Sequence, residues 1–370
     1  MNDFKIILKD LKEQSRYRSL NLPNGIDLTS NDYLGMAVHP LLREYAINAL
    51  ENGMDIGAAG SRLLRGHTDY HAELEEFACT YFSAPKTLFL ANGFIANYAL
   101  FTTLPSRHDV ILYDALIHAS VRDGMRASDA RSFKFLHNDI DALEKLLNLH
   151  KDSNIWVAIE SVYSMDGDSA PIMQIYNLIK RHDNAMLIID EAHATGIYGQ
   201  SGKGLAYDII QTNGYDKIIT LHTCGKAVGV AGGLICASAE IIDYMINKSR
   251  PFIYSTAPMP LQALLVRKSL EILACDDGAQ RRDKLLSLCI RAKELFGGAG
   301  SQIVPIILGE DEKAVRVAGA LQEAGYDIRA VRPPTVPQGS SRLRLSLSSN
   351  LDEYILQGFA DTLILNSVKI

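Results

Sequence analysis

The sequence predicts an α/β protein in which helices cover both faces of a mostly parallel central sheet, followed by a smaller α+β domain. Up to about residue 240, short and nearly continuous apolar runs alternate with helical patterns, which is typical of strands buried on both faces. The alternation ends at a proline-rich segment, residues 251–260, and 370 residues are enough for more than one domain. We therefore expect an N-terminal arm at 1–32, a large domain at 33–260 and a small C-terminal domain at 261–370.

Local patterns predict the elements in chain order. Apolar residues from Phe4 to Leu11 recur at helical spacing, so the chain should open with a short amphipathic helix. Six apolar runs predict the strands Thr87–Leu90, Val110–Tyr113, Trp156–Glu160, Met186–Asp190, Lys217–Leu221 and Gly233–Ala237. The C-terminal part should contain a long helical stretch (about Leu261–Phe296), a strand (Ile303–Leu308), a helix (Asp311–Ala324) and a strand (Arg342–Leu347). A last helix should begin at Asn350, with Glu353 completing an N-terminal cap pair.

Composition argues against several classes of protein. The net charge is −6, from 43 acidic and 37 basic residues, so no basic field favours nucleic acid or an anionic membrane surface. The longest stretch of low polarity, Ala227–Ala239, is short for a membrane span and contains glycines. Charges within the first 11 residues interrupt any signal-peptide core, and five cysteines without a C-x-x-C pair suit a reducing compartment. We expect a cytoplasmic protein with no nucleic-acid or membrane partner.

Polar residues follow several of the predicted strands, at the edge of the sheet where α/β proteins bind ligands. They include Asp190, the last residue of the strand at 186–190, and Lys226, five residues beyond the strand at 217–221. A carboxylate and a lysine at neighbouring strand ends suit pyridoxal 5'-phosphate, which needs a lysine for its Schiff base and an acid against its ring nitrogen. The turn Asn92–Phe94 before a predicted helix would offer N–H groups to the phosphate, and Ser164 and Thr223 would offer hydroxyls.

Other nucleotide and metal sites lack their partner motifs. Leu187–Glu191 is similar to a Walker-B strand, but the nearest imitation of a P-loop, Gly199–Gly204, has the wrong spacing and lies downstream. No G-x-G-x-x-G follows a strand, so nothing indicates a nicotinamide dinucleotide. No H-E-x-x-H and no cluster of cysteine and histidine indicates zinc, and we expect no metal.

Each candidate residue also has an ordinary explanation. A lysine such as Lys226 is often a solvated surface charge, and an aspartate such as Asp190 is often a helix cap. His118 is more often a hydrogen-bonded core or surface residue than a stacking partner. Cys224 is more readily a small buried residue than a nucleophile, and Arg62 could belong to a turn of small residues. The functional interpretation therefore depends on these residues occurring together.

Taken together, the motifs resemble those of the α-oxoamine synthases, fold-type-I pyridoxal phosphate enzymes that join an amino acid to an acyl thioester with loss of carbon dioxide. The resemblance covers nearly the whole chain. Its motifs are Ser30–Gly35, Gly60–Arg62 with Gly66 and His71, Asn92–Phe94, His118–Ser120, His137–Asp139, Ser164–Pro171, Asp190–His193 with Gly196, Thr223–Lys226, Tyr254–Thr256, Arg332–Pro337 and Arg342–Arg344.

Two of these motifs, Ser164–Pro171 (SMDGDSAP) and Arg332–Pro337 (RPPTVP), are most similar to members that condense L-alanine with a pimeloyl thioester in biotin biosynthesis. The carrier of the thioester would be coenzyme A or an acyl-carrier protein. The alternative within the family is a sister synthase that uses glycine or serine with another acyl-CoA. A rival from another class is an inactive, cofactor-bearing scaffold or regulatory protein, against which the complete set of motifs argues.

The resemblance also implies roles at the cofactor. Lys226 would hold pyridoxal phosphate and later act as the base at the substrate Cα, Asp190 would pair with the ring nitrogen, and His118 would stack on the ring; these three would be the catalytic residues. His193 would hydrogen-bond the ring oxygen. The phosphate would be surrounded by Gly93, Phe94, Ser164 and Thr223 of one subunit and by Ser255 or Thr256 of the other, because the family's active site lies at a homodimer interface.

The remaining implied roles concern the substrates. Arg344, the second arginine of R-L-R, would clamp the carboxylate of the amino acid through a bidentate guanidinium. The other substrate-binding residues would be Asn31, Arg332, Thr335 and an N-terminal arginine, either Arg16 or Arg18.

Overall fold

The computed structural model describes residues 3–366 and 368, and it divides the chain into two compact units. Unit 1 contains the described residues up to Tyr33, residues 164–168, and the described residues from Arg281 onward; unit 2 contains Leu34–Tyr163 and Ser169–Gln280. This division differs from the domains expected from the sequence in three ways. The N-terminal arm shares a unit with the C-terminal segment, residues 164–168 belong to unit 1 rather than to the large domain, and residues 261–280 belong to unit 2.

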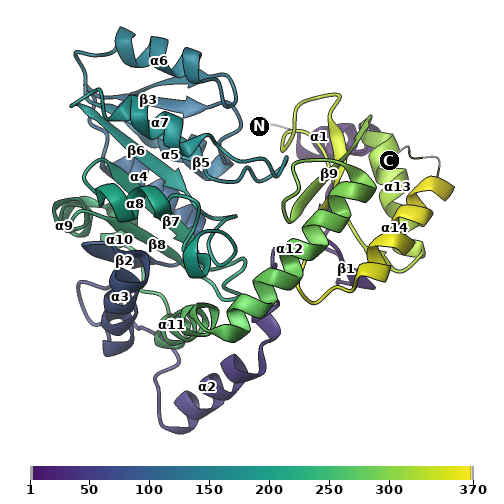
Figure 1. Cartoon of the computed structure of the whole chain (residues 1–370), viewed down its shortest axis with the longest axis horizontal. Helices are drawn as coiled ribbons and strands as arrows, with labels where there is room; N and C mark the ends of the chain where they lie inside the picture. Colours follow the sequence, from purple (N-terminus) through teal and green to yellow (C-terminus); the bar gives the residue numbers. More distant parts are fainter. Residues whose placement is uncertain (1–2, 367, 369–370) are drawn as a thin grey trace. The chain divides into compact units, whose positions relative to one another are not determined.

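Unit 2 is built on a seven-stranded sheet in the order β2-β8-β7-β6-β5-β3-β4 (Figure 1). β8 is antiparallel to both of its neighbours, β2 and β7, and β7, β6, β5, β3 and β4 are parallel to one another. The strands are β2 (Lys86–Leu90), β3 (Val110–Asp114), β4 (Arg131–Phe135), β5 (Ile155–Glu160), β6 (Ala185–Asp190), β7 (Ile218–Thr223) and β8 (Gly233–Ala237). The expected mostly parallel sheet is therefore confirmed, and Asp190 and Thr223 are the last residues of adjacent strands.

Helices cover this sheet because its strands are apolar on both faces. α4 packs against β7 and β8 and also contacts α5, α9 and α10, while α3 covers β2 and contacts α11. A buried cluster joins α4 and α5 to alternate positions of the strands, including Ile111, Ile188 and Ile219. The helices are η1 (Met36–Val38), α2 (Pro40–Glu51), α3 (Asp69–Phe82), α4 (Gly93–Thr103), α5 (Ala119–Ala127), α6 (Ile140–Leu149), α7 (Ile172–Ile179), η2 (Gln200–Gly202), α8 (Tyr207–Asn213), α9 (Ala239–Lys248), α10 (Arg250–Ile253) and α11 (Pro260–Ala274).

Unit 1 is an α+β unit, as the C-terminal pattern predicts. Its three-stranded antiparallel sheet has the order β11-β12-β9, and a short parallel pair joins β1 to β10. The strands are β1 (Ile26–Asp27), β9 (Ile303–Gly309), β10 (Tyr326–Asp327), β11 (Ala330–Val331) and β12 (Ser341–Ser346). The helices are α1 (Phe4–Glu13), α13 (Asp311–Glu323) and α14 (Glu353–Leu365), and α12 (Asp276–Phe296) contains the boundary between the units.

Two sequence-based boundaries are wrong. The long helical stretch is two helices, which end and begin on either side of Cys275, a residue with extended backbone. The last helix begins at Glu353 rather than Asn350, and its N-cap residue is Asp352, which makes no side-chain capping bond. The expected cap pair is absent from that helix because Leu351 is buried and its N–H bonds to the carbonyl of Ser348, so a turn occupies these positions. No helix in the described residues is long and apolar enough to cross a bilayer.

Candidate active site

The N-terminus of α4 lies against the end of β7. Asn92 caps the helix, and its side-chain oxygen accepts a hydrogen bond from the N–H of Ile95 at 2.9 Å. The N–H groups of Gly93 and Phe94 form no hydrogen bond within the described part of the chain. A Cβ atom on Gly93 would lie 2.8 Å from Thr223 Oγ1, so glycine leaves open a space between two free N–H groups and a hydroxyl. Such a space at a helix N-terminus is suited to a phosphate group.

The carboxylate of Asp190 is buried at the carboxyl end of β6. Its exposed fraction is 5%, and each of its oxygens accepts a hydrogen bond: Oδ1 from the N–H of Ala192 at 2.9 Å and Oδ2 from the amide Nδ2 of Asn97 at 2.7 Å. These two donors fix the plane of the carboxylate. A positively charged ring nitrogen is a suitable further partner, because a buried charge is stable only when it is paired and hydrogen-bonded.

His118 belongs to the same hydrogen-bonded network. Its Nδ1 lies 2.8 Å from Ser120 Oγ and accepts from the N–H of Ser120 at 3.2 Å, and Ser120 Oγ in turn accepts from Asn97 Nδ2 at 3.0 Å. Burial lowers the pKa of the His118 imidazole, the charge of Lys226 lowers it further, and the charge of Asp190 opposes this shift. His118 is therefore a neutral ring near both of these charged groups, as a stacking partner for a cationic ring needs to be.

Lys226 lies three residues beyond the end of β7, in a turn closed by two backbone hydrogen bonds. The N–H of Gly229 bonds to the carbonyl of Lys226, and the N–H of Val230 bonds to that of Cys224. Lys226 Nζ lies 2.8 Å from Nε2 of His193, in the turn that follows β6. The structure thus brings together the lysine and the histidine predicted from the sequence. Cys224 is 1% exposed and burial raises the pKa of its thiol, so it is a buried residue rather than a nucleophile.

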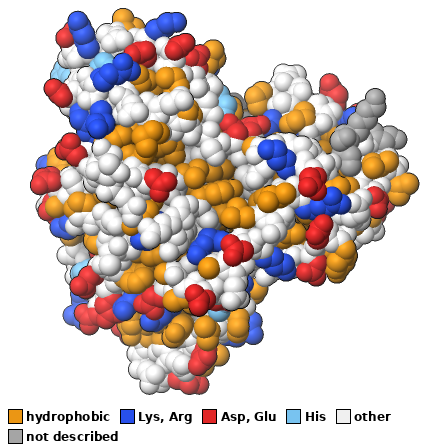
Figure 2. Space-filling model, viewed as in Figure 1, with side chains coloured by type: hydrophobic (Ala, Val, Ile, Leu, Met, Phe, Trp, Pro, Cys, Tyr) orange, Lys and Arg blue, Asp and Glu red, His pale blue; other side chains and the backbone are white. Residues whose placement is uncertain are grey.

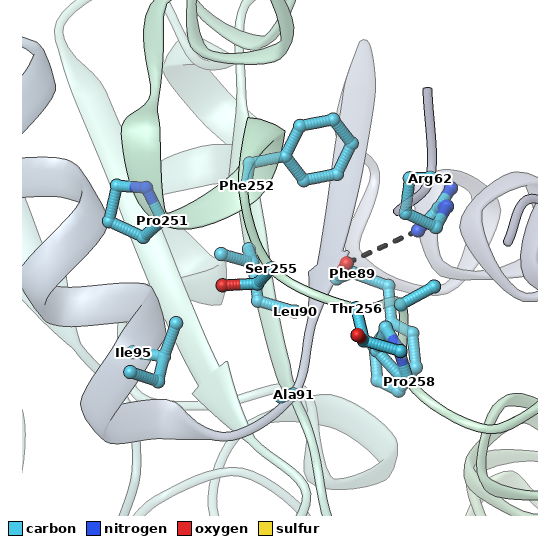
Figure 3. A pocket seen from close by; sticks show the side chains of 11 residues that line it. Arg62, Phe89, Leu90, Ala91, Ile95, Pro251, Phe252, Ser255, Thr256 and Pro258 are labelled. Atoms are coloured by element: carbon cyan, nitrogen blue, oxygen red, sulfur yellow. Dashed lines mark hydrogen bonds between the residues drawn. The ribbon is translucent and has the colours of Figure 1, made fainter. Parts of the chain in front are cut away.

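Ser255 and Thr256 are exposed and line a small cavity of about 60 Å³. Figure 3 shows them close to Ile95 of α4 and to Arg62. The segment is held in place from both sides, because the N–H of Ala257 bonds to the carbonyl of Gly60 and His71 Nε2 lies 2.9 Å from the carbonyl of Pro258.

Arg62 and His71 belong to the framework around that segment. Arg62 is 7% exposed, forms a 2.8 Å ion pair with Glu75 and donates to the carbonyl of Phe89 at 3.2 Å. Thr68 N–H donates to His71 Nδ1 at 3.3 Å, which places the ring proton on Nε2 and makes it the donor to Pro258. Burial lowers the pKa of His71 to about 4. These motif residues therefore have structural roles.

Unit 1 contains the residues predicted to bind the substrate carboxylate. Arg344 is 8% exposed. Four of its five N–H groups donate hydrogen bonds, and all four acceptors are neutral. Nε donates to the carbonyl of Ser164 at 2.6 Å, Nη1 to Ser346 Oγ at 2.7 Å and to Asn31 Oδ1 at 3.1 Å, and Nη2 to the hydroxyl of Tyr33 at 3.1 Å. Within the residues that the structure describes in unit 1, Arg344 forms no ion pair, whereas Arg342 pairs with Asp166 at 2.6 Å. A buried guanidinium without a counter-charge is suited to an anionic ligand.

Of the other arginines predicted from the sequence, Arg16 and Arg332 lie near Asp311, and Arg18 lies near Arg332. Arg16 Nε forms a 2.6 Å ion pair with Asp311 Oδ2, Arg332 donates to the carbonyl of Ser15, and Arg18 donates to the carbonyl of Pro333 at 3.4 Å. Burial lowers the pKa of the Arg332 guanidinium, and the charge of Arg18 lowers it further. Thr335 is exposed, and its N–H donates to the carbonyl of Arg332.

The chemistry of these residues fits pyridoxal phosphate. The space at Gly93, the buried Asp190 and the lysine beside His193 provide the phosphate, ring-nitrogen and lysine sites that this cofactor needs. The described residues contain no group of three or more histidine, cysteine, aspartate or glutamate side chains that could hold a metal ion.

Two buried residues in this region, Asn97 and Glu191, have roles that were not predicted from the sequence. The carboxyl of Glu191 accepts hydrogen bonds from Ser161 Oγ and the N–H of Ala206, both at 2.6 Å, and burial raises its pKa to about 7. It fastens the turn after β6 to the end of β5. Asn97 did have a signal in the sequence, since it is a polar residue in an otherwise apolar helical segment.

Comparison with known families gives one match over most of the chain. The model described as "Aminotransferase class I and II" matches residues 23–363. The chain belongs to this family. Within it, the relatives named below place the chain in the α-oxoamine synthase branch, so the resemblance seen in the sequence and the fold type it implied are confirmed.

One sequence relative and two solved structures illustrate what the chain is similar to. The 8-amino-7-oxononanoate synthase of Chromobacterium violaceum is 37% identical over 386 aligned positions, covering 98% of each chain. A serine palmitoyltransferase from S. paucimobilis, solved with bound PLP and myriocin, has a TM-score of 0.89 at 25% identity, covering 100% of this chain and 98% of that one. The 8-amino-7-oxononanoate synthase of Francisella tularensis has a TM-score of 0.77 at 26% identity, covering 93% and 98%.

Proposed function

We propose that the chain is a pyridoxal phosphate-dependent C-acyltransferase that condenses L-alanine with a pimeloyl thioester to form 8-amino-7-oxononanoate, carbon dioxide and free thiol. The observation that carries this proposal is the pair of adjacent strands β6 and β7, whose ends present the buried Asp190 carboxylate and the Lys226 amine beside His193. The 37% identity to a named synthase over nearly the full length of both chains supports the substrate assignment.

The chain's own groups can hold the cofactor at three points. The N–H groups of Gly93 and Phe94, with the hydroxyl of Thr223, would bind its phosphate, Asp190 would bind its ring nitrogen and His118 would lie against its ring. When bound, pyridoxal phosphate supplies an electron sink that stabilises negative charge at the amino-acid Cα. Ser164 is a further candidate for the phosphate.

Replacing Gly93 with alanine should weaken cofactor binding by about tenfold or more, equivalent to about 1.4 kcal/mol. The added Cβ would meet Thr223 Oγ1 at 2.8 Å and so fill the space meant for the phosphate. Titration of the cofactor-free variant with pyridoxal phosphate measures the effect. Gly319→Ala in α13 is the matched control, because a Cβ there has nothing within 4 Å; equal affinities of the two variants would contradict the phosphate site.

Chain groups would also handle the proton and the carboxylate of the amino acid. Lys226 Nζ, in its neutral form, would take the proton from the substrate Cα, and His193 Nε2 at 2.8 Å would orient that amine. Among the described residues of unit 1, one N–H of Arg344 has no partner, and the side chain of Asn31 bonds only through its Oδ1, which accepts from both Arg344 and Tyr33. We therefore infer a mixed clamp of one Arg344 N–H and the Asn31 amide N–H groups, in place of the bidentate guanidinium expected from the sequence. Arg16, Arg18, Arg332 and Thr335 remain candidates for the acyl substrate.

The test of the proposed function is thiol release with L-alanine, glycine and L-serine, each combined with pimeloyl, succinyl, acetyl and palmitoyl thioesters on coenzyme A and, for pimeloyl, on acyl-carrier protein. We expect L-alanine with the pimeloyl thioester to give the highest kcat/KM, at least about tenfold above glycine, because one methyl group in an apolar pocket is worth about that factor. Mass spectrometry identifies the product. A preference for glycine or serine would refute the substrate assignment and leave the cofactor assignment intact.

A sister synthase using serine and a long acyl chain is the second candidate. The fold overlaps more closely with the serine palmitoyltransferase structure, at a TM-score of 0.89, than with the Francisella synthase, at 0.77. Overall overlap does not discriminate within a family that shares one fold. The sequence relatives favour the first candidate, because 8-amino-7-oxononanoate synthases from several bacteria are 36 to 38% identical to this chain over most of its length.

We further propose that the protein is a cytoplasmic homodimer with a shared active site. Ser255 and Thr256 are exposed in a single chain, and several large apolar side chains on α2 and in the segments around it are exposed as well: Val38, Leu41, Ile47, Leu50, Ile56, Leu63 and Leu64. Figure 2 shows hydrophobic side chains on the part of the surface formed by α2.

All five cysteines are free thiols, which suits a reducing compartment. Sedimentation equilibrium should give twice the 40.7 kDa mass of one chain, and a monomer at micromolar concentration would contradict the dimer.

A further inference from the structure

The amide of Asn97 connects the two groups expected to act on the cofactor ring. Asn97 lies in the middle of α4, is 2% exposed, and donates both hydrogens of its Nδ2: one to Asp190 Oδ2 at 2.7 Å and one to Ser120 Oγ at 3.0 Å. Its own oxygen, Oδ1, is buried and has no hydrogen-bond partner in the described part of the chain. A buried acceptor without a partner is costly, so this arrangement needs an explanation.

The orientation of the amide is dictated by Asp190. Turning the amide over would place Oδ1 against the carboxylate of Asp190, where two acceptors would repel each other. The nitrogen must therefore face Asp190, and the unpaired oxygen is the consequence. An apolar residue would fill the same position on this apolar helix without leaving a polar atom unpaired, so the donor itself is what this position provides.

The same amide also determines the protonation of His118. Because Ser120 Oγ accepts a hydrogen from Asn97, its own hydrogen is available for His118 Nδ1 at 2.8 Å. The backbone N–H of Ser120 points to the same nitrogen at 3.2 Å. Nδ1 is thus an acceptor from two donors, and the single ring proton lies on Nε2. One asparagine therefore sets the plane of the carboxylate and, through Ser120, the rotation and tautomer of the imidazole.

We propose that Asn97 is a positioning residue that holds Asp190 and His118 as one unit, so that the ring nitrogen and the ring face of pyridoxal phosphate are contacted in a fixed geometry. This inference rests on the proposed function, because both partners act on that cofactor. Asn97 does not touch the reacting atoms; its effect on the ring nitrogen passes through Asp190, and its smaller effect on the ring face passes through Ser120 and His118.

The experiment compares two ligands that differ only at the ring nitrogen. Cofactor-free wild type and Asn97→Leu are titrated with pyridoxal phosphate and with its analogue in which a carbon atom replaces the ring nitrogen, following quenching of the single tryptophan, Trp156. Asn97→Leu should weaken pyridoxal phosphate about 10- to 100-fold, the worth of a hydrogen bond to a charged group, and the analogue by less than about threefold. Thr102→Val is the matched control on the same helix, because the Thr102 hydroxyl bonds, among the residues described, only to carbonyls of α4; it should change neither affinity.

Each result decides between explanations. Equal weakening of both ligands by Asn97→Leu would overturn the inference, because a merely structural residue would affect the whole ring site. Unchanged binding of both ligands would overturn it as well. If Asn97→Leu does not fold, Asn97→Ser, whose hydroxyl is too short to reach Asp190, takes its place with the same expectation. Wild-type protein that binds neither ligand would refute the proposed function itself, which is a distinguishable result.

Discussion

Replacing Lys226 with alanine should abolish the visible absorption of cofactor bound to the protein and lower kcat by at least about 100-fold. Proton transfer by a positioned side chain contributes about 10²- to 10⁴-fold to rates, and Lys226 is the amine placed 2.8 Å from His193 at the end of the central sheet. Absorption spectra of the purified variant and thiol release under saturating substrates measure the two effects.

The control for this variant is Lys217→Ala. Lys217 immediately precedes β7, at the opposite end of the strand that leads to Lys226, and its Nζ donates to the carbonyl of His182 at 2.7 Å. It should retain both the absorption and the rate, since it lies at the edge of the sheet away from the predicted site. An undiminished absorption band in Lys226→Ala would show that another group holds the cofactor.

The strands of unit 2 were predictable wherever the sheet is buried on both faces. β6, for example, is a continuous apolar run that ends at Asp190. The strand that the sequence did not reveal, β4, is at the edge of the sheet, and four of its five residues are exposed or partly exposed, including Arg131 and Lys134. The break between α11 and α12 was also missed, because apolar residues recur on both sides of it. The close approach of the two helices at this break is visible only in the structure, where a Cβ atom on Gly278 would lie 2.3 Å from the carbonyl oxygen of Leu273.

The candidate site was predictable to the extent that its residues follow strands. Asp190, Thr223 and Lys226 could be placed at one edge of the sheet from the order of the elements alone. Their partners could not be placed in this way, since Asn97 reaches Asp190 across 93 positions of sequence. The same holds for the number of free donors on Arg344, which depends on four acceptors from distant segments as well as from its own strand. Motif spacing identifies residue types at strand ends but carries no information on such contacts.

Replacing Arg344 with lysine should raise the KM for L-alanine about 10- to 100-fold, equivalent to the loss of one or two charge-assisted hydrogen bonds, and leave the KM for the thioester nearly unchanged. Lysine keeps the positive charge but not the planar set of donors. It would also release Asn31, whose Oδ1 is held by Nη1 of Arg344 at 3.1 Å and by the hydroxyl of Tyr33 at 2.8 Å. Both donors of the mixed clamp should therefore be disturbed by this single substitution.

Arg342→Lys distinguishes this effect from damage to unit 1. Arg342 lies two residues away on β12 and is also buried, but its charge is neutralised by Asp166 at 2.6 Å. Removing that ion-paired guanidinium should lower the melting temperature without changing the KM for L-alanine, because a carboxylate ligand is attracted by the arginine that has no counter-charge. Equal increases in that KM for the two variants would mean that the R-L-R motif acts on the substrate only through the stability of β12, and the carboxylate clamp would then have to be sought elsewhere.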